Sequence, residues 1–280
     1  MTLKPTFKGR LIAIGGNEDK QNELVVLKRV VKEIRKRDFK VAVLTTATEE
    51  PEQRAKEYRE VFTSLGATEI KVLDIRERSQ ANEEAHLKTL EESDLIFIVG
   101  GNQLRLTAIL GGSKVLASMS EQLKKGTLIA GTSAGAAAFS DAMIYEGVSE
   151  EGLIKGGVLT TSGFGFVENI IFDTHFMARG RFGRLVQIVT TNPTCTGVGL
   201  GEDSGVILSG DGEIEVIGSG QVIVVDGSEI NHSNIISIEP GGSIAVENIR
   251  IHSLAHGYRY NFKERKFITP SVEKLGAPND

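Results

Sequence analysis

The sequence predicts an α/β fold, a doubly wound and mostly parallel sheet with a β-rich C-terminal extension. In the first two-thirds of the chain, short continuous apolar runs alternate with helical patterns. This alternation is typical of parallel strands covered by helices on both faces. Several of these runs end in one glycine or two, where a tight turn leaves the strand. After Gly152, short apolar runs separated by Gly, Asp and Ser clusters predict hairpins instead.

The N-terminal elements are expected in alternating order. Leu11–Ile14 is a buried-strand candidate, and the apolar residues after it are spaced by three or four, as on one face of a helix: Leu24, Leu27, Val31 and Ile34. The same patterns predict strands over 41–44, 70–73, 95–99 and 128–130, and helices over 58–65 and 81–92. Strands of the extension are expected over 206–208, 214–217, 222–225 and 249–254. Because no proline-rich linker or repeat interrupts the chain, we expect a single domain over residues 1–280.

Composition and charge exclude several classes of function. Lys and Arg number 32 against 37 Asp and Glu, for a formal net charge of −5, and no basic stretch is longer than a helix face. We therefore expect neither nucleic-acid nor anionic-membrane binding. Cys195 is the single cysteine and the histidines lack metal-site spacing, so no disulfide, metal or cofactor is expected. No apolar run approaches the ~18 residues of a membrane helix, which favours a cytoplasmic protein.

The pentapeptide Gly131-Thr132-Ser133-Ala134-Gly135 matches G-x-S-x-G. An apolar run leads into it, and small residues suited to a packed helix follow it. A tight strand-to-helix turn of this kind lifts a serine hydroxyl out of the carboxyl edge of a sheet. The helix start after it offers backbone N–H groups to a developing oxyanion. A glycine-rich turn with an N-capping serine is the simpler alternative, but the strand and helix around the motif favour a nucleophile.

A nucleophilic serine needs a base and an acid that orients the base. His175 follows an apolar pair at the expected end of a strand, where open α/β sheets place their ligands. The acid candidates downstream are Glu202 and Asp203, which come directly after a strand-like run over residues 197–200. Charged residues at a strand end are more often solvated turn residues, so this pair is a weak signal when taken alone.

Two neighbouring features extend the candidate site. Arg179, Arg181 and Arg184 follow His175 within nine residues. Clustered guanidinium groups favour an acidic substrate because each can hold a carboxylate in a bidentate fork, whereas the alternative is a solvated, basic helix start. The doublet Gly100-Gly101 follows an expected strand and lets a backbone N–H face a pocket. It does not complete the G-x-G-x-x-G pattern of dinucleotide binding.

Taken in order, the motifs resemble those of the cyanophycinase family. The segments that carry the resemblance are Ile14-Gly15-Gly16, Val99-Gly100-Gly101-Asn102-Gln103, Gly131-Thr132-Ser133-Ala134-Gly135-Ala136, the run 173–185 with its histidine and three arginines, Gly199-Leu200-Gly201-Glu202-Asp203, and the late runs 251–254 and 257–260. They span nearly the whole chain, and the combination is far more specific than any one member. Two positions depart from the family pattern: Thr174 stands where Gln is common, and Asn102 where Asp is frequent.

The resemblance implies a serine exopeptidase with a class I glutamine-amidotransferase-like sheet, usually a homodimer. Ser133 would be the nucleophile, His175 the general base and Glu202 the acid that orients it. The backbone N–H groups of Gly101 and Ala134 would form the oxyanion hole. The positions that contact substrate in that family fall on Gln103, Asp173, Thr174, Arg179, Arg181 and Arg184. The implied substrate is cyanophycin, a poly-aspartate chain that carries arginine on each β-carboxyl, and the implied product is β-aspartyl-arginine.

Three other functions stay open at this point. An aspartyl dipeptidase of the same superfamily would use the same nucleophile turn on small aspartyl peptides. An α/β-hydrolase esterase would take its histidine later in the chain, where His256 is the candidate. A non-catalytic protein would keep the pocket and bind the polymer without turnover. The arginine cluster and the β-rich C-terminal region favour the polymer-degrading enzyme.

Overall fold

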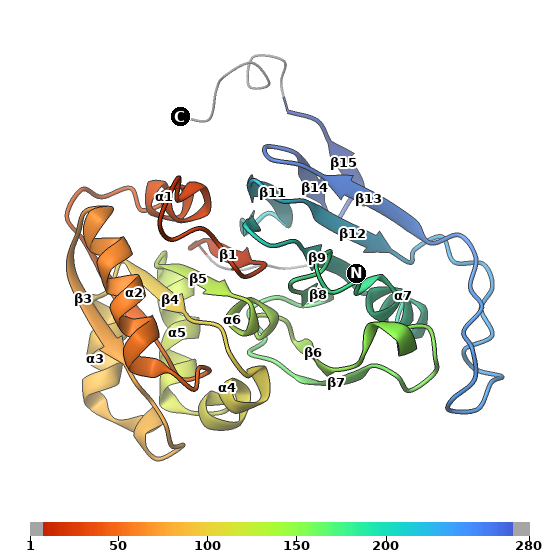
Figure 1. Cartoon of the computed structure of the whole chain (residues 1–280), viewed down its shortest axis with the longest axis horizontal. Coiled ribbons are helices and arrows are strands. Elements are labelled where there is room, and N and C mark those ends of the chain that lie inside the picture. Colours follow the sequence, from red (N-terminus) through yellow and green to blue (C-terminus); the bar gives the residue numbers. More distant parts are fainter. Residues whose placement is uncertain (1–7, 271–280) are drawn as a thin grey trace.

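Nine strands form the larger of the two main sheets (Figure 1). The computed structural model describes residues 8–270. The spatial order is β15-β14-β11-β10-β1-β5-β4-β2-β3, and the strands from β1 to β3 in this order are parallel. The bounds of the strands are Leu11–Ile14 (β1), Phe39–Leu44 (β2), Ala67–Leu73 (β3), Leu95–Ile98 (β4), Leu128–Thr132 (β5), Ser204–Leu208 (β10), Glu213–Gly218 (β11), Arg259–Asn261 (β14) and Lys266–Ile268 (β15). The predicted α/β class and mostly parallel sheet are confirmed.

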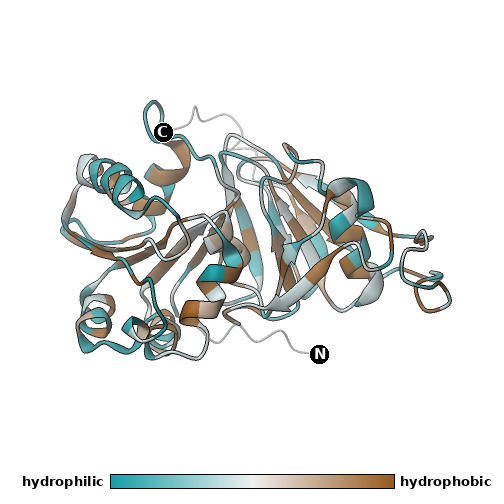
Figure 2. Ribbon diagram, turned by 60° about the horizontal axis from the view of Figure 1, so that its bottom comes forward, coloured by the Kyte–Doolittle hydropathy of each residue, from teal (hydrophilic) through white to brown (hydrophobic). Residues whose placement is uncertain are grey.

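Helices cover both faces of the parallel part of this sheet, as Figure 2 shows. The apolar strands have two buried faces, so alternate side chains of β1 enter different cores: Ile12 packs with the helices α1 and α2, and Leu11 with α3, α4 and α5. The bounds of the helices are Val25–Lys32 (α1), Pro51–Ser64 (α2), Glu84–Glu92 (α3), Gln103–Leu110 (α4), Lys114–Lys125 (α5), Ala134–Ala137 (α6) and Phe182–Thr191 (α7), with short 3₁₀ helices at Gln80–Asn82 (η1) and Ser149–Glu151 (η2). No helix in residues 8–270 is long and apolar enough to cross a membrane.

A second, four-stranded sheet lies beside the first in the order β13-β12-β9-β8. Its strands are Ile170–Asp173 (β8), Thr196–Leu200 (β9), Val222–Asp226 (β12) and Arg250–Leu254 (β13). Helix α7 makes the crossover between the parallel strands β8 and β9. Val198 and Val224 of this sheet share one apolar core with Val206 of the first sheet, so the two sheets pack face to face.

The sequence pattern did not distinguish these two sheets. It placed the strands after residue 200 in one extension, whereas β10 and β11 extend the first sheet and β12 pairs with β9 and β13. Strands buried on both faces are apolar throughout, so their pattern does not show which sheet they join. Helices α4 and α5 and the two-stranded sheet of β6 (Ala142–Glu146) and β7 (Leu159–Ser162) were also not predicted.

A buried carboxylate ties the second sheet to the first. Asp226 on β12 has no exposed surface, and its carboxylate accepts a hydrogen bond of 3.2 Å from the Tyr260 hydroxyl on β14. It also pairs with the guanidinium groups of Arg250 and Arg265. Burial alone would raise the pKa of Asp226, but hydrogen bonds from Ser228 and the charge of Arg265 outweigh burial and hold that pKa below its ordinary value.

We expect Asp226→Ala to lower the free energy of unfolding by about 3–5 kcal/mol at neutral pH, because it leaves two guanidinium groups without their buried partner. Since the folded-state pKa of Asp226 is depressed, its contribution is complete above the ordinary carboxyl range and is lost as the pH falls through the folded-state value. Thermal melts across pH measure both effects. The control is Glu229→Ala, which removes an exposed partner of Arg250 and should cost about 1 kcal/mol or less. Equal costs for the two variants would contradict this interpretation.

Candidate active site

Ser133 lies at the sharp turn between β5 and α6. Its backbone has φ 51° and ψ −114°, a sparsely populated conformation for a non-glycine residue, and its N–H donates to the carbonyl of Ile14 at 2.9 Å. The first and last residues of the motif are glycines, and they let the helix approach the sheet closely. A Cβ on Gly131 would come within 2.7 Å of the Gly135 backbone, and one on Gly135 within 2.5 Å of the Ile98 carbonyl oxygen. The structure therefore has the strand–turn–helix that presents a serine hydroxyl above the sheet edge.

The first and second sheets meet at this turn and bring three predicted residues together. His175 follows β8, and its Nε2 lies 3.0 Å from the Ser133 Oγ. Glu202 follows β9, and its Oε1 lies 2.8 Å from the His175 Nδ1. The three residues occur along the chain in the order serine, histidine, glutamate. Their side chains form a continuous hydrogen-bonded chain from the Glu202 carboxylate to the Ser133 hydroxyl.

The electrostatics of this hydrogen-bonded chain favour an ionised Glu202. Hydrogen bonds from His175 and then from the Asn17 amide, which donates at 3.1 Å, hold the pKa of Glu202 below its usual value. An ionised carboxylate keeps the proton of a neutral imidazole on Nδ1 and leaves Nε2 free to accept the serine proton. The arrangement can therefore activate Ser133 by general-base catalysis.

The segment directly after β1 forms backbone hydrogen bonds with the residues around His175 and Glu202. The backbone N–H of His175 donates to the Gly15 carbonyl at 2.8 Å, and the N–H of Asp203 donates to the Gly16 carbonyl at 3.1 Å. Asp203, the second acid candidate, does not contact His175; its carboxylate accepts from the Asp19 N–H at 3.0 Å and from the Ser219 hydroxyl at 2.5 Å. Asp203 therefore links the loops that contain Asp19 and Ser219, and it does not orient His175.

Glu18 and the contact of Asn17 with Glu202, both in this same segment, were not predicted from the sequence. Polar residues directly after a buried strand are a usable signal, because this edge of an open α/β sheet holds the ligands. His256, the histidine of the esterase alternative, is exposed in the turn between β13 and β14, and His175 occupies the position beside Ser133.

Gly101 and Ala134, the predicted oxyanion-hole residues, lie near the turn at Ser133. Gly100 packs so closely that a Cβ on it would lie 3.0 Å from the Ser133 Cβ, which places the next peptide beside the turn. Within residues 8–270, neither the Gly101 N–H nor the Ala134 N–H donates to another protein group. Both N–H groups are therefore without an acceptor among the described residues. Helix α6 spans only four residues, so its dipole adds little.

Three of the predicted substrate contacts form a buried ionic cluster. The Asp173 carboxylate lies 3.1 Å from the Arg181 Nη1 and 3.1 Å from the Arg184 Nε. Arg181 also donates to the Thr174 carbonyl at 2.7 Å, and Arg184 to the Gly147 carbonyl at 2.9 Å. The side chain of Arg184 is 4% exposed and that of Arg181 is 15% exposed. The solvated helix start that served as the alternative is therefore wrong for these two arginines, whereas Arg179 is exposed.

Gln103, a further predicted substrate contact, lies at the N-terminus of α4. Asn102 caps this helix by accepting from the Arg105 N–H at 3.0 Å, and the Gln103 amide donates to the carbonyls of Ile144 and Tyr145, each at 3.3 Å. Thr174 is buried.

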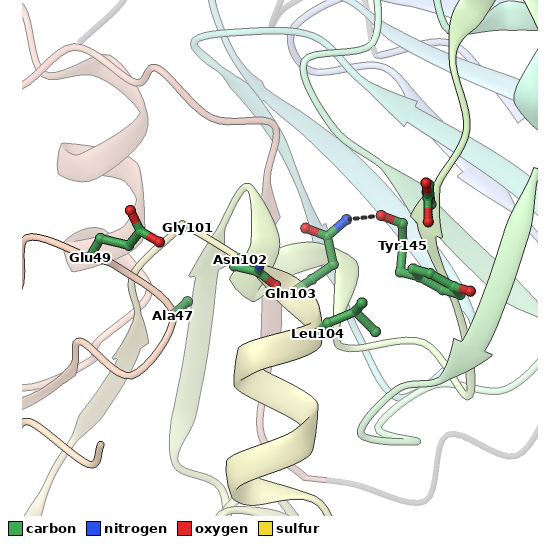
Figure 3. Close-up of a pocket in the computed structure, with 8 residues that line it drawn as sticks. Ala47, Glu49, Gly101, Asn102, Gln103, Leu104 and Tyr145 are labelled. Carbon is green, nitrogen blue, oxygen red and sulfur yellow. Dashed lines mark hydrogen bonds between the residues drawn. The ribbon is translucent and has the colours of Figure 1, made fainter. Parts of the chain in front are cut away.

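An open groove of about 440 Å³ lies at the N-terminus of α4 (Figure 3). It is lined by Ala47, Glu49, Gly101, Asn102, Gln103, Leu104, Tyr145 and Glu146. Glu49 and Glu146 are exposed, and neither carboxylate forms an ion pair with another of the described residues. The groove is lined by Gly101, and the preceding residue, Gly100, packs against Ser133.

Comparison with known proteins decides the family. A family model described as Peptidase family S51 matches residues 11–217. The chain belongs to this family. It is 33% identical to the cyanophycinase of Geminocystis herdmanii over 97% of this chain and 100% of that protein. It is 32% identical to the cyanophycinase of Trichormus variabilis over 99% of this chain and 93% of that one. The family resemblance noted in the motifs is thus confirmed, and this S51 member is a peptidase.

Solved structures support the fold of this S51 peptidase. A peptidase from an acI-B1 actinobacterium superposes with a TM-score of 0.61 at 22% identity, over 80% of this chain and 93% of that one. A Listeria monocytogenes protein described as peptidase E gives a TM-score of 0.54 at 18% identity, over 76% of this chain and 99% of that one. Within the described residues, no group of three or more His, Cys, Asp or Glu is placed to hold a metal ion.

We expect Gly16→Ala to lower activity roughly 10²-fold, because a displacement of about 1 Å in a catalytic group has a cost of this order. Gly16 has φ +102°, and a Cβ there would lie 2.4 Å from the Cε1 and 2.5 Å from the Nε2 of His175. The matched control is Gly241→Ala, where φ is +89° but nothing lies within 4 Å of the added Cβ. Both variants carry similar backbone strain, so steady-state kinetics and thermal melts separate strain from the clash. Full activity in Gly16→Ala would contradict the assigned position of the base.

Proposed function

We propose that this S51 peptidase is a serine-type exopeptidase that hydrolyses cyanophycin to β-aspartyl-arginine through a Ser133–His175–Glu202 triad. The observation that carries the proposal is the pair of contacts at 3.0 Å and 2.8 Å that links the three side chains at the nucleophile turn. The substrate class comes from the relatives, since proteins named cyanophycinase align over nearly the full length of this chain.

The proposed reaction proceeds through an acyl-enzyme. The Ser133 Oγ attacks an aspartyl carbonyl carbon while the His175 Nε2 takes the hydroxyl proton. The N–H groups of Gly101 and Ala134 stabilise the oxyanion. His175 then gives its proton to the leaving amine, and the carbon–nitrogen bond breaks. A water molecule, deprotonated by His175, finally hydrolyses the ester and restores the serine.

Each repeat of cyanophycin presents a carboxylate and a guanidinium group, and the site offers partners for both. Arg179 is exposed next to His175, and Arg181 keeps part of its guanidinium open beside Asp173. We assign the substrate carboxylate to these two arginines. The buried Arg184 and Asp173 fix their geometry, because Asp173 lies within 3.1 Å of both Arg181 and Arg184. For the substrate guanidinium we assign the groove carboxylates of Glu49 and Glu146, which have no cationic partner among the described residues.

Aspartyl dipeptide hydrolysis is the second candidate function. Thr174 and Asn102 favour it, because they shorten or neutralise side chains relative to the family pattern. The two candidates share the triad and differ in the groove, because a small dipeptide does not need to place a guanidinium group there. As in the family it resembles, we further propose a cytoplasmic homodimer, which light scattering after size exclusion tests.

Ser133→Ala and His175→Ala should each lower kcat by on the order of 10⁴–10⁶ while leaving polymer binding nearly intact, because each removes a group that acts in the transition state. Because hydrogen bonds from His175 and Asn17 hold the pKa of Glu202 below its usual value, Glu202 should stay ionised near neutral pH and its titration should not limit activity there. The measurements are release of soluble product and polymer sedimentation.

The control for this experiment is His256→Ala, which should keep wild-type kcat. Loss of activity in His256→Ala alone would move the protein to the esterase alternative. A serine-directed phosphonate that fails to label Ser133 in folded protein would instead support the non-catalytic binder.

Glu49→Gln and Glu146→Gln should raise KM for cyanophycin about two- to fivefold, since an exposed ion pair contributes about 1 kcal/mol or less. kcat should stay near that of the wild type, and hydrolysis of aspartyl dipeptides without a guanidinium group should not change. Glu150→Gln, which removes an exposed carboxylate outside the groove, is the matched control. Equal KM values for all four proteins would exclude the groove as the guanidinium site.

A further inference from the structure

A buried glutamate, Glu18, is linked through Thr132 to the turn that holds Ser133. Glu18 lies in the segment after β1, and its side chain is 1% exposed. One oxygen accepts from the Tyr58 hydroxyl of α2, and the other accepts from the Thr132 hydroxyl of β5 at 2.6 Å. Lys20 Nζ lies 3.5 Å from the same carboxylate and 5.4 Å from the centre of the Tyr58 ring.

These contacts connect the segment after β1 to the nucleophile strand. Thr132 is the last residue of β5 and directly precedes Ser133, whose N–H donates to the Ile14 carbonyl at 2.9 Å. Glu18 therefore fixes the strand end at the point where the strained turn begins. A carboxylate hydrogen bond is stronger and shorter than a neutral one, so it restricts the Thr132 side chain more tightly.

The same segment also holds the other two members of the proposed triad. Its Gly15 carbonyl accepts from the His175 N–H, and its Asn17 amide donates to Glu202. A single short stretch thus contacts the base and the acid directly and reaches the nucleophile through Glu18 and Thr132. Any shift of this stretch relative to β5 would change the distance from the Ser133 Oγ to the His175 Nε2.

We propose that Glu18 is a positioning residue: with Tyr58 and Thr132 it holds the segment after β1 against β5 and so fixes the Ser133–His175 contact. It touches no reacting atom. A purely structural role would be served as well by apolar side chains of similar volume, because a buried charge has a desolvation cost. The inference rests on the proposed triad and adds a residue that sets its geometry.

The test measures the rate at which a small phosphonate labels Ser133 in intact protein, together with kcat and KM for cyanophycin. Glu18→Gln keeps the shape of the side chain but turns an amide toward one of the two hydroxyl donors. Thr132→Val removes the hydroxyl that Glu18 holds, and Thr132→Ser retains it. Glu33→Gln is the matched control, because Glu33 is a buried carboxylate (7% exposed) that pairs with Arg10 and Arg29 at α1, away from the site.

We expect Glu18→Gln and Thr132→Val to lower both the labelling rate and kcat roughly 10²-fold, with KM near the wild-type value. Thr132→Ser should restore most of the rate, and Glu33→Gln should lower the melting temperature without changing kcat. Labelling of Glu18→Gln at the wild-type rate would overturn the proposal. If Glu18→Gln does not fold, equal labelling of Thr132→Val and Thr132→Ser overturns it instead. A wild type that labels nowhere would overturn the triad itself, which is a distinct result.

Discussion

The proposed chemistry depends on how two sheets meet. The proposed nucleophile, Ser133, follows β5 of the first sheet, whereas His175 and Glu202 follow β8 and β9 of the second. The backbone hydrogen bond of 2.8 Å from the His175 N–H to the Gly15 carbonyl joins the sheets at that place. Neither sheet alone holds a complete triad. The apolar core shared by the two sheets, and the buried Asp226 that links β12 to β14, therefore serve the active site as well as stability.

Close backbone approach at this junction accounts for part of the high glycine content, 32 residues in 280. A Cβ on Gly15 would lie 1.9 Å from the Gly201 carbonyl oxygen, so a side chain there would push the β1 and β9 strand ends apart. Gly16 leaves room for the imidazole ring in the same way. The close packing of the two sheets at this junction requires glycine. This requirement explains why glycine doublets follow strands in the sequence.

The sequence predicted the parallel strands because their apolar runs are continuous and end in glycine. It also singled out Ser133, His175 and Glu202, which the fold brings into hydrogen-bond contact. It did not predict the burial of Arg181 and Arg184, since a run of arginines at a helix start has the pattern of a solvated surface. Glu18 was missed for a related reason: it lies in a polar segment, and its partners Tyr58 and Thr132 are 40 and 114 residues away. Buried polar contacts between distant segments leave no periodic signal, and neither does the division of apolar strands between two sheets.

The most direct test of the account is the identity of the product. Purified protein is incubated with insoluble cyanophycin granules, and the soluble fraction is analysed by mass spectrometry. Ser133→Ala protein is treated in the same way as the blank. The account predicts that the wild type releases β-aspartyl-arginine and that the blank releases none. Intact granules, with efficient cleavage of short aspartyl dipeptides by the same protein, would contradict the proposed substrate and assign the site to a dipeptidase.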